Sequence, residues 1–177
     1  KAIILAPAAA PPAKLTQILQ YNAVLYPVEG IYDDAFDLSM SVAEANRWYL
    51  RSTGINPVLS EGKKTVGLEI AEQMNWQVPD KIFVPTGDGC IIAGVYKAFY
   101  DLVRLGWTSK LPQLIAVQAE GSPAIANALA SGAPMRRVRS ETIADSISVD
   151  LPRDGEKAIQ AVKATKGYGI TVSDDEI

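Results

Sequence analysis

The residues whose types and spacing best suit chemistry form the segment Pro85-Thr-Gly-Asp-Gly-Cys90, between a predicted strand and a predicted helix. Its glycines allow backbone N–H groups to close on an anion, and the following helix directs the positive end of its dipole at the same place. The pattern predicts a phosphate cradle. Because the dinucleotide fingerprint and the Walker lysine are both absent, the alternative is a tight turn in which Asp88 only caps the helix.

Cys90, the only cysteine, stands in the first turn of that predicted helix. A helix N-terminus can lower the pKa of a thiol, which would make Cys90 a nucleophile or a redox sensor. The chain has no histidine, so no imidazole base, Ser-His-Asp triad or His-containing metal site is available. We therefore favour a small structural residue at Cys90, expect no metal site, and retain carboxylate, lysine, tyrosine or cofactor chemistry.

A group of three arginines, Arg136, Arg137 and Arg139, lies in a stretch of weak periodicity over residues 131–153. These side chains could contact a substrate phosphate. A solvated charged loop is the more common explanation for such a group.

The composition is that of a globular domain, with 177 residues, 48% hydrophobic and 21% charged. The net charge of -3 argues against a nucleic-acid partner. No apolar run approaches the roughly 20 residues needed to span a bilayer, and no signal peptide is visible. We therefore expect no membrane partner and a cytoplasmic location.

Apolar runs and amphipathic stretches alternate along the chain. The predicted strands cover residues 2–6, 24–28, 81–85, 114–118 and 168–172. The predicted helices cover residues 13–22, 33–49, 61–74, the stretch from Gly89 to about 105, 123–130 and 155–166. Strands that are apolar on both faces and alternate with helices indicate an α/β fold, a three-layer αβα arrangement with a mostly parallel sheet. Ligands of such sheets bind at the carboxyl ends of the strands, where residues 86–90 lie.

The best candidate for a boundary between subdomains is Asn56-Pro57, because the residue before a proline is disfavoured in the helical region. The chain begins without Met, directly on a predicted strand. It ends on Ser173-Asp-Asp-Glu176, the pattern of a capping box with no helix body after it. We expect a central segment of a longer protein.

Four blocks of the sequence resemble threonine synthase in order and spacing. The first is the strand, glycine loop and helix over residues 84–99, and the second is Lys110-Leu-Pro-Gln-Leu-Ile-Ala-Val-Gln-Ala-Glu-Gly121. The third, Gly54-Ile-Asn-Pro-Val-Leu-Ser-Glu-Gly-Lys-Lys-Thr65, is similar to the family's Asn-Pro…Glu-Gly-Gln-Lys-Thr segment. The fourth is Val28-Glu-Gly-Ile-Tyr-Asp-Asp-Ala35, with the strand and the Ala-Lys-Leu helix before it.

The resemblance implies an incomplete pyridoxal-phosphate enzyme of fold type II, the tryptophan synthase β class. It implies a lyase that acts on a small amino-acid substrate and converts O-phosphohomoserine to threonine and phosphate, with the cofactor ring as electron sink. Residues 1–55 would end the smaller subdomain, and residues 56–177 would belong to the larger, cofactor-binding one. The family is mostly homodimeric, so a homodimer is expected.

The resemblance also assigns the site residues. The phosphate of pyridoxal 5'-phosphate would be bound by Gly87, Asp88, Gly89, Cys90 and Ile91. Asn56 and Glu61 match a segment on the substrate side of the pocket. None of the ten lysines has the context of the family's Schiff-base lysine, which would lie outside this chain. Lys63 and Lys64 are interpreted as a solvated helix start.

The glycine loop departs from the family's Gly-Asn-X-Gly-Asn pattern, since an aspartate and an isoleucine replace two side-chain amides. Asp88 would place a negative charge near a phosphate, which is unfavourable unless its carboxylate points away or binds another group. Backbone N–H groups could still hold the phosphate. A second hypothesis therefore stays open, a non-catalytic phosphate-binding or interaction module that retains the fold without the lysine.

Overall fold

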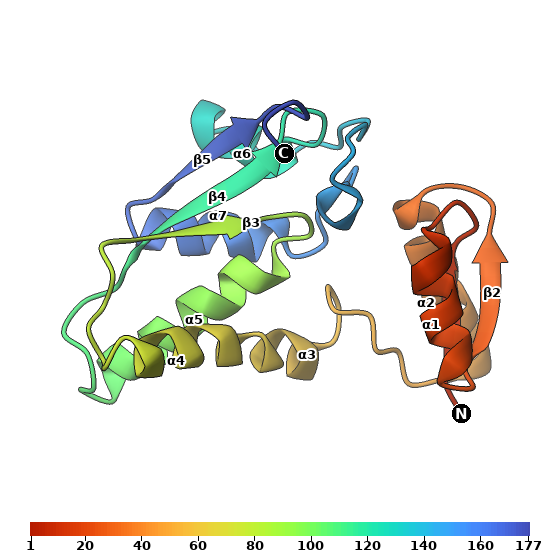
Figure 1. Ribbon diagram of the computed structural model, residues 1–177, viewed down its shortest axis with the longest axis horizontal. Helices are drawn as coiled ribbons and strands as arrows, with labels where there is room; N and C mark the ends of the chain where they lie inside the picture. The colour runs from red at the N-terminus through yellow and green to blue at the C-terminus, as the bar shows by residue number, and fades with distance from the viewer. The chain divides into compact units, whose positions relative to one another are not determined.

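The computed structural model describes residues 1–177, which divide into two compact units, residues 1–52 and residues 53–177 (Figure 1). The strands form two parallel sheets, one of two strands and one of three. The α/β class with parallel strands is thus confirmed. The strands do not share a single sheet, because each unit pairs only its own strands.

The first unit is a β-α-β crossover followed by a longer helix. It contains β1 (Ile3–Pro7), α1 (Pro12–Gln20), β2 (Val24–Val28) and α2 (Tyr32–Asn46). The two strands run parallel with Ile3 opposite Val24, and α2 packs against β1.

Helix α2 ends earlier than its predicted limit of residue 49. Its start is fixed by the Asp34 carboxylate, which accepts the Ile31 N–H at 2.8 Å. At its end Arg47 adopts the left-handed conformation with φ 55°, which stops the helix. Trp48 and Tyr49 therefore lie beyond the helix as exposed side chains, and the predicted extension through them was wrong.

The second unit carries the glycine loop. Its elements are α3 (Pro57–Gly62), α4 (Lys64–Gln73), β3 (Lys81–Pro85), α5 (Cys90–Arg104), β4 (Gln113–Ala119), α6 (Ala124–Ser131), the 3-10 turn η1 (Asp145–Ile147), α7 (Gly155–Ala164) and β5 (Tyr168–Val172). The strand order is β3-β4-β5, all parallel, with Lys81 opposite Gln113 and Ile115 opposite Tyr168.

The core of this unit surrounds the central strand β4. Leu114, Ile115 and Ala116 are completely buried. Helices α5 and α7 pack against each other and against the sheet, and α6 contacts both β4 and β5. The fully buried Ile92 and Phe99 of α5 join the same core, as the apolar spacing of that helix predicts.

The helix predicted over residues 61–74 corresponds to α4, and a separate short helix, α3, precedes it at Pro57–Gly62. Asn56 is the N-cap of α3 and accepts the Val58 N–H at 3.1 Å, and Pro57 occupies the first helical turn. The chain then breaks at Lys63, between α3 and α4. Most of α3 was missed because Asn-Pro, interpreted as a boundary, is also a helix-initiation signal.

Helices α4 and α5 lie close together. A Cβ added at Gly67 of α4 would come within 2.6 Å of the Ala98 Cβ, and one added at Gly94 of α5 would come within 2.5 Å of the Lys63 Cβ. Beyond the ends of the two helices, the Trp76 and Trp107 rings meet edge to face with centroids 4.8 Å apart.

At the end of the chain, both the N–H and the hydroxyl of Ser173 donate to the Glu176 carboxylate, at 3.0 and 2.9 Å. These contacts reproduce one half of the predicted capping box. None of the helices is both long enough and apolar enough to cross a membrane.

Candidate functional site

The glycine loop, residues 86–89, connects the carboxyl end of β3 to the first residue of α5. Thr86 fixes the loop to the sheet, because its N–H donates to the Val117 carbonyl at 2.8 Å and its own carbonyl accepts the Gln118 amide at 3.0 Å. At the other end, Gly89 has φ +90°. That conformation is one that a side chain disfavours, so the turn requires glycine there.

The N–H groups of Gly87, Gly89, Cys90 and Ile91 have no acceptor within the protein. The first backbone N–H of α5 that has an acceptor is that of Ala93, which donates to the Gly89 carbonyl at 3.2 Å. These free donors lie at the N-terminus of a 15-residue helix, where the positive end of the helix dipole also attracts an anion. The loop therefore fits an anion such as a phosphate group.

The Asp88 carboxylate binds another group. Its Oδ1 accepts the N–H of Arg153 at 3.0 Å, and the Asp88 carbonyl accepts the N–H of Asp154 at 2.9 Å. Both donors belong to the segment that begins α7. The charge that an anion would meet is thus hydrogen-bonded to backbone, which moderates the repulsion expected from the sequence.

Cys90 is buried, with 7% of its surface exposed. Burial raises the pKa of its thiol to about 12, assisted by a hydrogen bond to Asp154 and by the negative charges of Asp154 and Asp88. A thiol with that pKa stays protonated at neutral pH. The geometry therefore favours the structural role for Cys90 over a nucleophile or sensor.

Asn56 and Glu61, the residues predicted on the substrate side, both form hydrogen bonds or ion pairs within the second unit. Asn56 is 6% exposed and caps α3. Glu61, on the same helix, pairs with Lys64 and lies 3.7 Å from the Lys97 ammonium. The hydrogen bond from Lys64 lowers the pKa of Glu61, so it is a carboxylate at neutral pH.

Lys64 of the Glu-Gly-Lys-Lys-Thr segment is held by carboxylates of α3 and α5. Lys64 pairs with Glu61 and lies 3.5 Å from Asp101 of α5. Its hydrogen bond to Glu61 raises the pKa of Lys64, which keeps the ammonium protonated. A protonated amine is a poor nucleophile, as expected for a residue outside the covalent chemistry.

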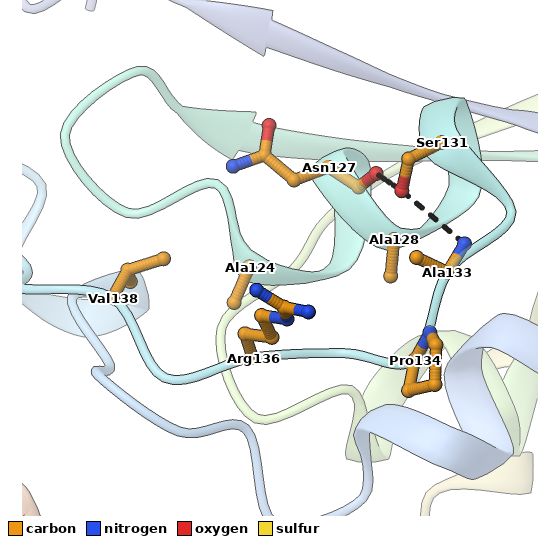
Figure 2. Close-up of a pocket in the computed structure, with 8 residues that line it drawn as sticks. All are labelled: Ala124, Asn127, Ala128, Ser131, Ala133, Pro134, Arg136 and Val138. Carbon is orange, nitrogen blue, oxygen red and sulfur yellow. Dashed lines mark hydrogen bonds between the residues drawn. The ribbon is translucent and has the colours of Figure 1, made fainter.

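A hollow of about 310 Å³ lies along α6 (Figure 2). Ala124, Asn127, Ala128, Ser131, Ala133, Pro134, Arg136 and Val138 line it. In Figure 2 the Ser131 hydroxyl donates to the Asn127 carbonyl at 2.7 Å and accepts the Ala133 N–H at 3.3 Å. None of the residues of the glycine loop lines this hollow, and of the three arginines only Arg136 does.

The sequence did not predict which residues hold the glycine loop in place. Arg153 and Asp154 bond to Asp88, and the Ser60 hydroxyl lies 3.2 Å from the Asp154 carboxylate. Ser60 and Asp154 are 94 positions apart. No local pattern marks such contacts, because the α/β topology alone brings them together.

Comparison with known proteins identifies the family. The family profile described as "Pyridoxal-phosphate dependent enzyme" matches residues 1–177. The chain is 37% identical to threonine synthase of Methanosarcina acetivorans over 166 residues, which are 93% of this chain and 41% of that protein. It is 36% identical to threonine synthase of Methanocaldococcus jannaschii, with the same coverage. The chain thus spans about two fifths of the length of these curated relatives.

Solved structures agree on the fold. An L-serine ammonia-lyase from Rhizomucor miehei superposes with a TM-score of 0.80 at 24% identity, over 98% of this chain and 52% of that one. A serine racemase from Dictyostelium discoideum superposes with a TM-score of 0.75 at 23% identity, over 99% of this chain and 53% of that one. These neighbours have the fold type II architecture. The chain belongs to the family of pyridoxal-phosphate dependent enzymes, whose cofactor is pyridoxal 5'-phosphate.

Proposed function

We propose that the protein containing this chain is a threonine synthase, a lyase that converts O-phosphohomoserine to threonine and phosphate. The observation that carries this proposal is the 37% and 36% identity to two threonine synthases over 93% of the chain. The racemase and ammonia-lyase of similar fold are only 23% and 24% identical, a level that speaks for architecture alone.

In this proposal the glycine loop holds the phosphate of the cofactor. The N–H groups of Gly87, Gly89, Cys90 and Ile91 donate to it, and the N-terminus of α5 adds its dipole. Backbone donors do not depend on side-chain identity, so the loss of the family's two side-chain amides is compatible with binding. When bound, the cofactor supplies an electron sink for carbanions at the amino-acid substrate.

The remaining roles follow the family. We propose that residues 56–177 belong to the larger, cofactor-binding subdomain and residues 1–55 to the smaller one. Asn56 and Glu61 would act on the substrate side, through the position and charge of α3. The Schiff-base lysine would come from outside these 177 residues. A cytoplasmic homodimer is part of the same proposal, and light scattering of the purified full-length protein tests the dimer.

The decisive experiment is an activity comparison with the full-length protein that contains this chain. We expect release of phosphate and threonine from O-phosphohomoserine. Racemisation of L-serine and deamination of L-threonine, measured in parallel, should be slower by orders of magnitude. Faster turnover of L-serine or L-threonine would replace the proposal with a racemase or an ammonia-lyase.

One observation keeps a second candidate function open. The loop replaces the family's amides, and no lysine of the chain has the Schiff-base context. A full-length protein that binds the cofactor or phosphate but turns over none of the three substrates would be a binding module. The absorbance of the bound cofactor distinguishes this outcome from a protein that fails to bind at all.

A further inference from the structure

Asp154 is a buried carboxylate that bonds to α3 and α7 and acts on the first residue of α5. Only 2% of it is exposed. Its Oδ1 accepts the Lys157 ammonium of α7 at 2.6 Å, and its Oδ2 lies 3.2 Å from the Ser60 hydroxyl of α3. The carboxylate also faces the first residue of α5, Cys90, whose thiol pKa it raises.

The position of Asp154 before α7 is that of a helix cap, yet its side chain does not cap. No side-chain cap hydrogen bond joins it to the N–H groups of its own helix. Apart from Lys157, its carboxylate partners are on α3 and α5. Burying a carboxylate costs free energy unless hydrogen bonds or charges compensate it. Because the partners of Asp154 include residues of two other helices, we infer that its side chain holds those helices together.

The backbone around Asp154 also supports the glycine loop directly. Its N–H donates to the Asp88 carbonyl, and the neighbouring Arg153 N–H donates to the Asp88 carboxylate. A Cβ added at Gly89 would come within 2.9 Å of the Asp154 carbonyl oxygen and 2.8 Å of the Ala158 Cβ. The loop therefore rests on the first turn of α7 without a gap.

We propose that Asp154 is a positioning residue for the glycine loop. Its carboxylate holds Cys90 and Ser60 in a fixed relation, while its backbone holds Asp88. The free N–H groups of the loop then remain directed at a single anion. Asp154 also joins the loop to α3, the helix that carries the predicted substrate residue Glu61. The inference rests on the proposed function for the identity of the anion, the phosphate group of pyridoxal phosphate.

The test compares two ligands that differ only in that phosphate. The full-length protein and its Asp154→Asn variant are titrated with pyridoxal phosphate and with pyridoxal, and both affinities are measured from cofactor absorbance. Asparagine keeps the size of the side chain and removes its charge. We expect the preference for pyridoxal phosphate over pyridoxal to fall about tenfold, the scale at which supporting contacts orient binding groups.

The matched control is Thr165→Val, at the opposite end of α7. The Thr165 hydroxyl is also buried, accepts the Leu114 N–H at 3.2 Å and donates to the Ala161 carbonyl at 3.0 Å. Its loss destabilises the same helix without touching the loop. We expect the preference for the phosphate-bearing ligand to stay unchanged in this variant, although its Tm falls.

Ser60→Ala serves as the second variant, because removing one hydroxyl from α3 is a milder change than altering a buried charge. We expect its phosphate preference to fall in the same direction by a smaller factor. An unchanged preference in Asp154→Asn, or in Ser60→Ala if the former does not fold, would overturn the inference. Failure of the unmodified protein to prefer pyridoxal phosphate would instead contradict the proposed function.

Discussion

At the scale of single residues, Asp88 places a carboxylate in a loop whose proposed ligand is also an anion. Its Oδ1 accepts the Arg153 N–H, a bond that an asparagine oxygen can keep and an alanine cannot. We expect Asp88→Asn to leave the affinity for pyridoxal phosphate unchanged or tighter, because a repulsive charge is removed. Asp88→Ala should weaken it about fivefold, since one such hydrogen bond contributes on the order of 1 kcal/mol.

Titration of the full-length protein with pyridoxal phosphate measures both variants of Asp88. Clearly weaker binding by Asp88→Asn would show that the negative charge itself anchors the loop. If Asp88→Ala bound pyridoxal phosphate as tightly as the unmodified protein, the bond to Arg153 would not determine the position of the loop.

Cys90 should make stability depend on pH in the alkaline range. Burial raises the pKa of its thiol from the ordinary 9.0 to about 12. The folded chain therefore keeps a proton that the unfolded chain loses, and stability falls as pH rises between these values. Urea denaturation at pH 8 and about pH 11 should show a smaller loss for Cys90→Ser than for the unmodified chain. An equal loss would mean that the thiol does not titrate as its surroundings indicate.

Features of single residues could be predicted from the sequence where they depend on neighbours close in the chain. The glycine spacing over residues 86–90 predicted the turn, and its place before an apolar helix predicted the free N–H groups. The partner of Asp88 could not be predicted, because Arg153 lies 65 positions away. The sequence left two outcomes open for the Asp88 charge, and only tertiary contacts decide between them.

At the scale of elements, the contact of the glycine loop with the first turn of α7 predicts the cost of a single methyl group. We expect Gly89→Ala to lower the free energy of unfolding by about 1–2 kcal/mol for its positive φ. The close approach to Asp154 and Ala158 should add about 1–3 kcal/mol, the usual cost of overpacking. Urea denaturation measures the total.

The control for Gly89→Ala is Gly106→Ala. Gly106 also has a positive φ, +74°, but a Cβ there would have no neighbour within 4 Å. This variant should show the conformational cost alone. Similar losses in the two variants would mean that the loop does not rest on α7.

Element boundaries show where local patterns compete. The strands over residues 81–85 and 168–172 were predicted to the residue, because each is a short apolar run next to turn residues. The helix predicted over residues 61–74 found α4 from its apolar spacing but missed most of α3, which is a separate short helix that ends before Lys63. Periodicity locates a helical face, whereas capping and tertiary packing decide where each helix begins and ends.

At the scale of the whole molecule, the alternation of strands and helices was enough to predict parallel pairing. Its division into separate sheets was not visible, because pairing between strands depends on how distant segments meet. The chain also spans only about two fifths of the relatives it matches, and its ten lysines lack the Schiff-base context. Together these facts lead to a prediction for the isolated chain.

We expect the 177-residue chain alone to form no threonine and to bind pyridoxal phosphate weakly, through the phosphate. A lysine must be held against the reactive carbon of the ring for strong binding, and only the phosphate anchor is encoded here. Borohydride reduction with peptide mapping should find no stoichiometric cofactor adduct on one lysine. Such an adduct would contradict the proposal that the lysine lies elsewhere, and the full-length protein serves as the positive control.

The tryptophans are distributed so that each unit carries its own optical signal. Trp48 lies in the first unit, and the edge-to-face pair of Trp76 and Trp107 lies in the second. Indoles so close couple their strongest electronic transitions, which adds to the far-ultraviolet circular dichroism spectrum an exciton band that an isolated tryptophan lacks. In a Trp48→Phe chain this band and the remaining tryptophan fluorescence both come from the second unit. Melting of the unit that holds the glycine loop can therefore be followed separately, without any attached dye.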